Sequence, residues 1–200
     1  MPLHTLLSQR LPRWATPLLL ATVLSACQTP PAPAPYTGPV LPIEQTERGV
    51  QIYLPSSVLF EVGKSALNNA AADPYLDRVA SLLTTKTQKK IALEGHADNT
   101  GTESSNQALS EQRATTIASA LTARGVPAAR IDTAGFSSRR PRASNATEDG
   151  RALNRRVEVV ILDEKVETIT QGEPANAFAS AFSQLKEMME KGLVKPVEGQ

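Results

Sequence analysis

The sequence predicts a two-layer α/β (α+β) domain in which helices cover one face of a single sheet. Apolar residues alternate with polar ones, as in half-buried strands, at residues 50–54, 90–95, 130–135 and 155–162. Apolar residues recur at helical spacing at residues 74–85 and 102–124. Strands that alternate with helices favour this architecture, because each helix can bury its apolar face on the sheet.

The first strand and first helix have boundary signals. The strand at 50–54 ends at Pro55. Asp73 is a suitable N-cap, and Pro74 suits the first helical position, where the missing N–H of proline costs least. The first helix is therefore expected to span 74–85.

The later elements are bounded in the same way. The helix at 102–124 ends at Gly125, a residue that favours helix termination. A short helix at 148–153 is expected to open at Thr147, just before the strand at 155–162.

The tail at 166–200 is expected to contain an amphipathic helix at about 174–191. Pro174 marks its start, and apolar residues from Phe178 to Met189 recur at helical spacing. Its apolar face either folds back on the domain or binds a partner protein.

Residues 1–26 have the pattern of a secretory signal peptide. Arg10 and Arg13 precede an apolar run that is too short to span a membrane, and small residues follow just before Cys27. Residues 24–27 resemble the bacterial lipobox, in which the cysteine is lipidated. Lipidation explains the position of the single cysteine, since one thiol cannot form an internal disulfide. A plain signal peptide with an unmodified cysteine is the alternative.

Residues 27–46 are expected to form a proline-rich linker. Six prolines between positions 28 and 42 favour an extended polyproline II chain over helix or sheet. At about 3 Å per residue, such a chain spaces a domain roughly 40–50 Å from a lipid surface. Without the two signal-peptide arginines, 19 basic residues face 20 acidic ones, which disfavours nucleic-acid binding.

Arg113 stands out because it lies where an apolar residue is expected. It is four residues from both Leu109 and Ile117 on the inward face of its helix, and Asn106 shares that face. A guanidinium keeps its charge and is expensive to bury without an anion. The sequence therefore predicts an anionic partner for Arg113.

Asp98 lies on the loop that leads into the same helix. The loop follows the carboxyl end of a strand, where open α/β sheets place ligands. Two readings of the pair remain open. Asp98 and Arg113 form an internal salt bridge, or they bind the ammonium and the carboxylate of a zwitterion.

Catalytic and metal sites are less well supported. Outside the signal peptide His96 is the only histidine, and no Gly-x-Ser-x-Gly elbow is present. Glu94, His96 and Asp98 alternate and offer metal-ligand atoms, but such a pattern is more often a strand edge and a polar loop. We expect no metal or cofactor. Arg155 shares a face with Val157 and adds positive charge to the ligand end of the sheet or bridges an acid such as Asp73 or Glu148.

Several spaced segments, in this order along the chain, match the sequence pattern of a known family: residues 91–101, Asn106, 109–114, 125–127, 130–131 and 154–158. Together these segments resemble the OmpA-like C-terminal peptidoglycan-binding domain, assigned here to 47–165. The resemblance implies a β-α-β-α-β fold with an added strand (β-α-β-α-β-β), and the helical tail lies outside that minimal domain.

The resemblance also implies noncovalent binding of diaminopimelate in the peptidoglycan stem peptide. By position, Asp98 and Arg113 would hold the diaminopimelate and Asn106 would support it. The pocket rim would be Gly95, His96, Ala97 and Thr100, and the further supporting candidates are Gly63, Asn154 and Arg155.

The predicted function is that of an outer-membrane lipoprotein on the periplasmic face. Anchored through Cys27, it would tether the membrane to the cell wall without catalysis. Two alternatives remain open: a subunit of an envelope complex that recruits a partner through the helix at 178–189, and a periplasmic hydrolase with His96 as its base.

Overall fold

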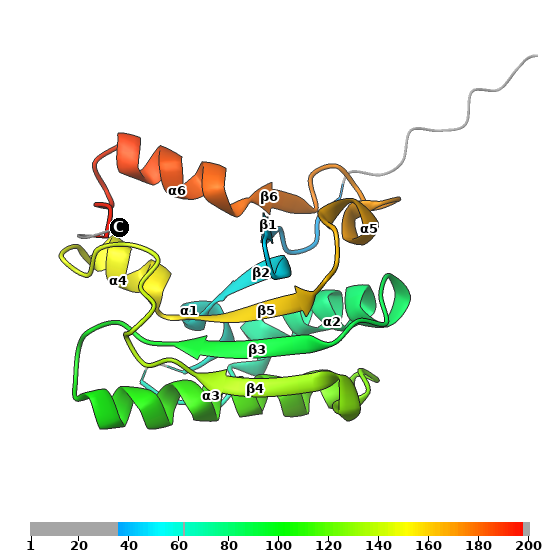
Figure 1. Cartoon of the computed structure of the whole chain (residues 1–200), viewed down its shortest axis with the longest axis horizontal. Coiled ribbons are helices and arrows are strands. Elements are labelled where there is room, and N and C mark those ends of the chain that lie inside the picture. Colours follow the sequence, from blue (N-terminus) through cyan, green and yellow to red (C-terminus); the bar gives the residue numbers. More distant parts are fainter. Residues whose placement is uncertain (1–35, 62, 198–200) are drawn as a thin grey trace, which may run out of the picture. The chain divides into compact units, whose positions relative to one another are not determined.

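The structure is a computed structural model that describes residues 36–61 and 63–197. Within this part, one six-stranded sheet has the order β4-β3-β5-β2-β1-β6 (Figure 1). Its strands are β1 (Leu41–Thr46), β2 (Gly49–Pro55), β3 (Ile91–His96), β4 (Ile131–Gly135), β5 (Arg156–Leu162) and β6 (Phe178–Ser180). β4 runs parallel to β3 and β6 runs parallel to β1, whereas the other neighbours are antiparallel. The signal peptide and Cys27 lie outside the described residues.

The helices complete a two-layer domain. They are α1 (Ser56–Leu59), α2 (Asn69–Thr85), α3 (Glu103–Ala123), α4 (Glu148–Asn154), α5 (Val166–Thr170) and α6 (Ala181–Glu190), with one 3-10 turn η1 (Ala128–Arg130). Figure 1 shows α2 and α3 against one side of the sheet and α6 beyond the β1–β6 edge. The predicted α/β class is therefore confirmed.

The core lies between α2, α3 and the facing side of the sheet. On β5, Val157, Val159 and Ile161 are fully buried in it, because alternate residues of a strand share a face. The intervening residues Arg156 and Glu158 point to the other side and are also buried. The second side of the sheet therefore also carries buried charged groups, which the prediction of an ordinary two-layer domain did not include.

The predicted start of α2 was wrong. The helix begins at Asn69, and Pro74 lies inside it instead of at its first position. Proline at this point leaves the carbonyl of Ala70 without an intrahelical donor, and Ala70 is exposed, so water can bond that carbonyl. The predicted starts of the two other helices are confirmed by their caps: Thr102 Oγ1 accepts from Ser105 N, and Thr147 Oγ1 accepts from Gly150 N.

Two strands lie where none was expected. β1 falls within the stretch assigned to the proline-rich linker, and it pairs with β2 in an antiparallel hairpin. Pro42 is tolerated because it lies near the start of the strand. β6 replaces the first turn of the helix predicted from Pro174, and Phe178 pairs with Leu41. Sheet pairing outweighs the local helical pattern here, and α6 begins only at Ala181.

Candidate functional site

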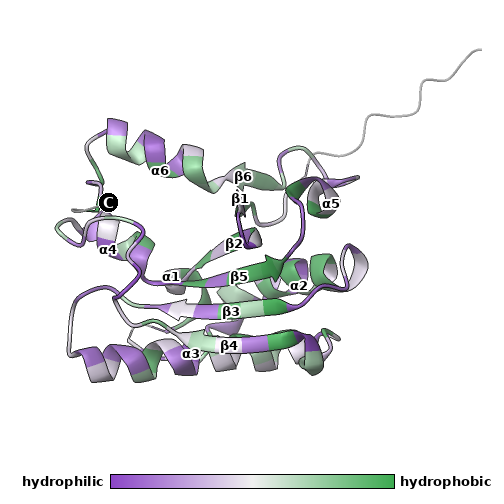
Figure 2. Ribbon diagram, in the orientation of Figure 1, coloured by the Kyte–Doolittle hydropathy of each residue, from purple (hydrophilic) through white to green (hydrophobic). Residues whose placement is uncertain are grey.

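The candidate site lies where β3 leads through residues 97–102 into α3. Figure 2 shows that the N-terminal half of α3, next to this loop, is more hydrophilic than its C-terminal half. Asn106, Ser110 and Arg113 are nevertheless buried on the inward face of this helix. Polar side chains of α3 are thus buried at the end of the sheet where β3 leads into this loop.

Two paired glycines let α3 approach the sheet at this point. Gly95 on β3 and Gly135 on β4 are opposite each other in the register. A Cβ on Gly95 would lie 2.0 Å from the carbonyl oxygen of Ser110, and a Cβ on Gly135 would lie 2.6 Å from the backbone nitrogen of Glu111. Side chains at these positions would force the helix away, so Gly95 has a structural reason to be glycine.

Arg113 is buried, with only 5% of its surface exposed. Its Nε donates to the carbonyl of Lys64 at 3.1 Å, and its Nη1 lies 3.4 Å from the hydroxyl of Ser56. Its guanidinium also lies 5.0 Å from the ring centre of Phe60. Among the described residues no salt bridge joins it to a carboxylate. Burial and then the charge of Arg155 lower the pKa of Arg113, while Asp98 opposes them.

Asp98 is held by its own loop and by an arginine other than Arg113. Its Oδ1 accepts from the backbone N–H of Thr100 at 2.9 Å and from the Thr100 hydroxyl. Its Oδ2 accepts from Arg155 Nη1 at 2.6 Å. Burial alone would raise the pKa of Asp98, but the bonds from Thr100 and Arg155 outweigh burial and lower it. The carboxylate is therefore ionised at neutral pH.

Arg155 links the buried carboxylate of Asp98 to the exposed carboxylate of Glu148. Its Nη2 donates to Glu148 Oε1 at 2.6 Å, so one guanidinium bridges two carboxylates. Of the two acids proposed from the sequence, Glu148 is correct, whereas Asp73 pairs with Arg124. The internal salt bridge between Asp98 and Arg113, one of the two alternatives left open by the sequence, is not formed, and Asp98 pairs with Arg155 instead.

The other predicted residues shape the loops of the site. Asn106 Nδ2 donates to the carbonyls of Asp98 and Thr100 at 3.0 and 2.8 Å, which fixes the loop. Ala97 N donates to the Ser137 carbonyl at 2.8 Å. These contacts are to backbone atoms, so Asn106 acts on the site by positioning Asp98.

Two supporting candidates lie around this centre with different roles. Asn154 is fully buried and bonds the backbone of Arg142 and Ala143, so it orders a neighbouring loop. Gly63 is exposed with φ of +70°, next to the Lys64 carbonyl that Arg113 binds.

His96 does not contact this site, which corrects its assignment to the pocket rim. Because the Cα of Gly95 faces α3, the next side chain on the strand points to the opposite face. His96 is 1% exposed there, with its ring stacked on Phe136 at 5.5 Å between centres. Burial lowers its pKa, so it is neutral at pH 7. In this position it cannot reach a substrate as a hydrolytic base.

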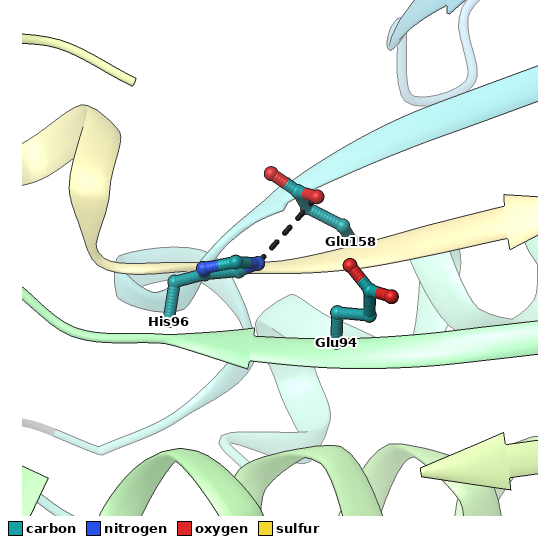
Figure 3. A group of neighbouring side chains, drawn as sticks. All are labelled: Glu94, His96 and Glu158. Carbon is teal, nitrogen blue, oxygen red and sulfur yellow. Dashed lines mark ion pairs between the residues drawn. The ribbon is translucent and has the colours of Figure 1, made fainter. Parts of the chain in front are cut away.

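The side chains of Glu94, His96 and Glu158 form a buried cluster on that face (Figure 3). Their candidate metal-ligand atoms lie within 4.8 Å of one another, and His96 Nε2 is 3.5 Å from Glu158 Oε2. The trio proposed from the sequence had Asp98 in place of Glu158, which the strand register places directly opposite Glu94.

Arginines already neutralise this cluster. Arg48 binds both oxygens of Glu94 at 2.6 and 3.0 Å, and Arg156 binds Glu158 at 2.6 Å. Burial would raise the pKa of Glu158, but its contacts with His96 and Arg156 lower it to about 2. A divalent cation would meet two guanidinium groups at these carboxylates, so the cluster fits an internal ion network better than a metal centre.

Sequence reasoning missed the Asp98–Arg155 pair and the partners of Arg113. Arg155 was recognisable as an inward arginine, but nothing in the sequence indicated which acid it would reach. Ser56, Phe60 and Lys64 come from a segment with no clear periodicity, so no local signal placed them beside α3.

No helix among the described residues is both long and apolar enough to span a bilayer. The chain is similar to proteins of bacterial envelopes. The outer-membrane lipoprotein YfiB of Pseudomonas aeruginosa is 34% identical over 144 residues, which cover 69% of this chain and 85% of YfiB. The peptidoglycan-binding protein ArfA of Mycobacterium tuberculosis is 39% identical over 135 residues. That match covers 67% of this chain but 40% of ArfA, so the chain spans well under half of that relative.

Solved structures show the same fold. The cell wall anchor of the type VI secretion system (T6SS) of Pseudomonas aeruginosa matches with a TM-score of 0.56 and 30% identity, over 61% of this chain and 87% of that one. The model of the OmpA family matches residues 59–155, which include α3, the loop before it and Arg155. From this match and the similarity to nearly the whole of YfiB, the chain belongs to the OmpA family.

Proposed function

We propose that the chain binds peptidoglycan noncovalently by holding the diaminopimelate of the stem peptide between Asp98 and Arg113. The observation that carries this proposal is the buried guanidinium of Arg113, which has no carboxylate partner among the described residues. A ligand carboxylate would supply the missing anion, and Asp98 is an ionised acceptor for the ammonium of the same ligand. The names of the relatives agree with a role at the cell wall.

The role is binding without turnover. Holding a zwitterion needs one fixed cation and one fixed anion, which the end of β3 and the face of α3 provide. His96, the only histidine outside the signal peptide, is enclosed on the other face of the sheet. The charge arrangement of the site therefore supports a tether.

Sedimentation with purified sacculi tests the proposed site. Arg113→Ala and Asp98→Asn are each expected to reduce the fraction of protein bound by at least about tenfold, because each removes a charge-assisted contact. Arg124→Gln, which removes an arginine at the far end of α3, is the matched control and should bind normally. Normal binding by Arg113→Ala would remove Arg113 from the site.

We infer further that Cys27 carries the lipid that anchors the chain in the outer membrane. The lipobox-like residues before it and the proline-rich segment after it support an anchor followed by a spacer. Cys27→Ser is expected to move the protein from the membrane fraction to the soluble periplasmic fraction. Retention of this variant in membranes would contradict the anchor.

A second candidate function is recruitment of a protein partner through α6. Phe182 is 61% exposed on this helix, which is unusual for a phenylalanine in a folded domain. Removal of α6 should abolish this recruitment and leave wall binding unchanged.

A further inference from the structure

Arg155 is paired with the Asp98 carboxylate, which the ammonium of the proposed ligand would need. Its Nη1 lies 2.6 Å from Asp98 Oδ2, and the Asp98 side chain is only 6% exposed. The other oxygen, Oδ1, is already held by Thr100. An arriving ammonium must therefore take a place next to a guanidinium or replace it.

Replacement is favoured by charge. The positive charges of Arg113 and Arg155 repel each other, and this repulsion lowers the pKa of Arg113. Adding an ammonium beside Arg155 would put a third cation near one carboxylate. If the ammonium takes the place of Arg155, Asp98 keeps one cationic partner before and after binding.

Arg155 is also the member of this group that can move. Its side chain is 34% exposed, whereas Asp98 is enclosed and fixed by Thr100. Its second nitrogen is already bonded to Glu148 at 2.6 Å, and the Glu148 side chain is 66% exposed. Glu148, the first residue of α4, also binds Arg151 three residues further along the same helix. A short rotation away from Asp98 would leave Arg155 paired with Glu148.

We propose that Arg155 is a built-in substitute for the ligand ammonium, and that Glu148 retains it when the ligand binds. Arg155 and Glu148 are then positioning residues that set the affinity of Asp98 for ammonium-bearing ligands. This inference rests on the proposed binding of diaminopimelate at Asp98 and Arg113. It adds an exchange step that the free protein must complete before that ligand is held.

Calorimetric titration of the full mature chain with diaminopimelate, in detergent, tests the exchange. Glu148→Gln is expected to weaken binding about two- to fivefold, the range for loss of an exposed ion pair, because Arg155 loses its alternative partner. Arg155→Gln is expected to tighten binding by a similar factor, because the competing cation is gone. Glu148→Asp should restore most of the affinity.

The decisive measurement is the double variant. If Glu148 acts only through Arg155, Glu148→Gln has no effect in a chain that already carries Arg155→Gln. Glu187→Gln removes a similarly exposed, paired acid on α6 and is the control that should bind as the unmodified chain does.

The outcomes are distinguishable. If the unmodified chain does not bind diaminopimelate, the proposed function fails and the exchange fails with it. If the chain binds but Arg155→Gln weakens binding, Arg155 contacts the ligand directly and the exchange is wrong. An effect of Glu148→Gln that persists without Arg155 also overturns it.

Discussion

Gly95 determines how closely α3 approaches the sheet beside the site. Its Cα faces the carbonyl of Ser110, so α3 lies against the strand with no side chain between them. Arg113 is one helical turn from Ser110 on the same face, so this contact also sets the depth of the guanidinium. A residue with no functional group therefore contributes to the geometry of the binding groups.

Gly95→Ala is expected to lower the free energy of unfolding by about 1–3 kcal/mol, because its Cβ would lie 2.0 Å from a backbone oxygen that cannot move alone. Urea denaturation measures the change. Ala92→Ser adds one atom to the opposite face of the same strand and should change stability by less than about 0.5 kcal/mol. Equal stability of the two variants would mean that α3 is not held this closely.

At the scale of elements, α6 illustrates how a helix can be attached and still expose an apolar face. Ala181 at its start is fully buried, and Val194 just beyond its end is 3% exposed. Arg142 donates to the carbonyl of Ala181, and Ser144 N donates to that of Lys195. The fold-back reading of the tail is thus correct for the two ends, while Phe182 between them remains exposed.

Removal of residues 181–200 is expected to leave sacculus binding unchanged, because none of the contacts of Asp98 or Arg113 described above comes from α6. The cut retains β6 and therefore the edge pairing with β1. If α6 recruits a partner, Phe182→Ser and the truncation should abolish the same species in periplasmic cross-linking, and Lys186→Gln should preserve it. Loss of wall binding in the truncated chain would place α6 in the site.

At the scale of the whole molecule, the polar face of the sheet links three strands through buried charges. Glu94 and Glu158 lie opposite each other on β3 and β5, an arrangement that is destabilising unless cations separate them. Arg48, from the turn after β1, and Arg156 provide those cations, and Gln51 on β2 also donates to Glu158. The network therefore makes the stability of the sheet depend on pH.

Stability is expected to fall in acid in two steps. The lowered pKa of His96 means that protonation costs more in the folded state, so stability declines as pH falls below about 6.5. The pKa of Glu158 is about 2 in the fold against an ordinary value of about 4.5, so its contribution is complete above about 4.5 and is lost between about 4.5 and 2.

Urea titrations at several pH values measure this dependence. Glu158→Gln removes the contribution of this carboxylate, so its free energy of unfolding should vary less between pH 5 and 3 than that of the unmodified chain. Glu190→Gln, on the exposed side of α6, is the control and should retain the full dependence. Parallel curves for Glu158→Gln and the unmodified chain would contradict a strongly lowered pKa.

Local pattern was sufficient for the elements that carry the site. The alternation at β3 and β5, the helical spacing of α3 and the caps at Thr102 and Thr147 all act within a few residues of the chain, so they can be recognised without neighbours. The inward position of Arg113 follows from the same spacing. These features are properties of single elements.

The pairing of charges was decided only when the elements packed. Asp98 and Arg155 are 57 residues apart, and the sequence offered Arg113 as an equally good partner. β1 and β6 likewise form through backbone pairing, β1 with both β2 and β6, although β1 lies in the stretch assigned to the proline-rich linker and β6 lies in a stretch with a helical pattern. Ion pairs and edge strands gain their free energy from contacts between distant segments, and no local periodicity encodes which segments will meet.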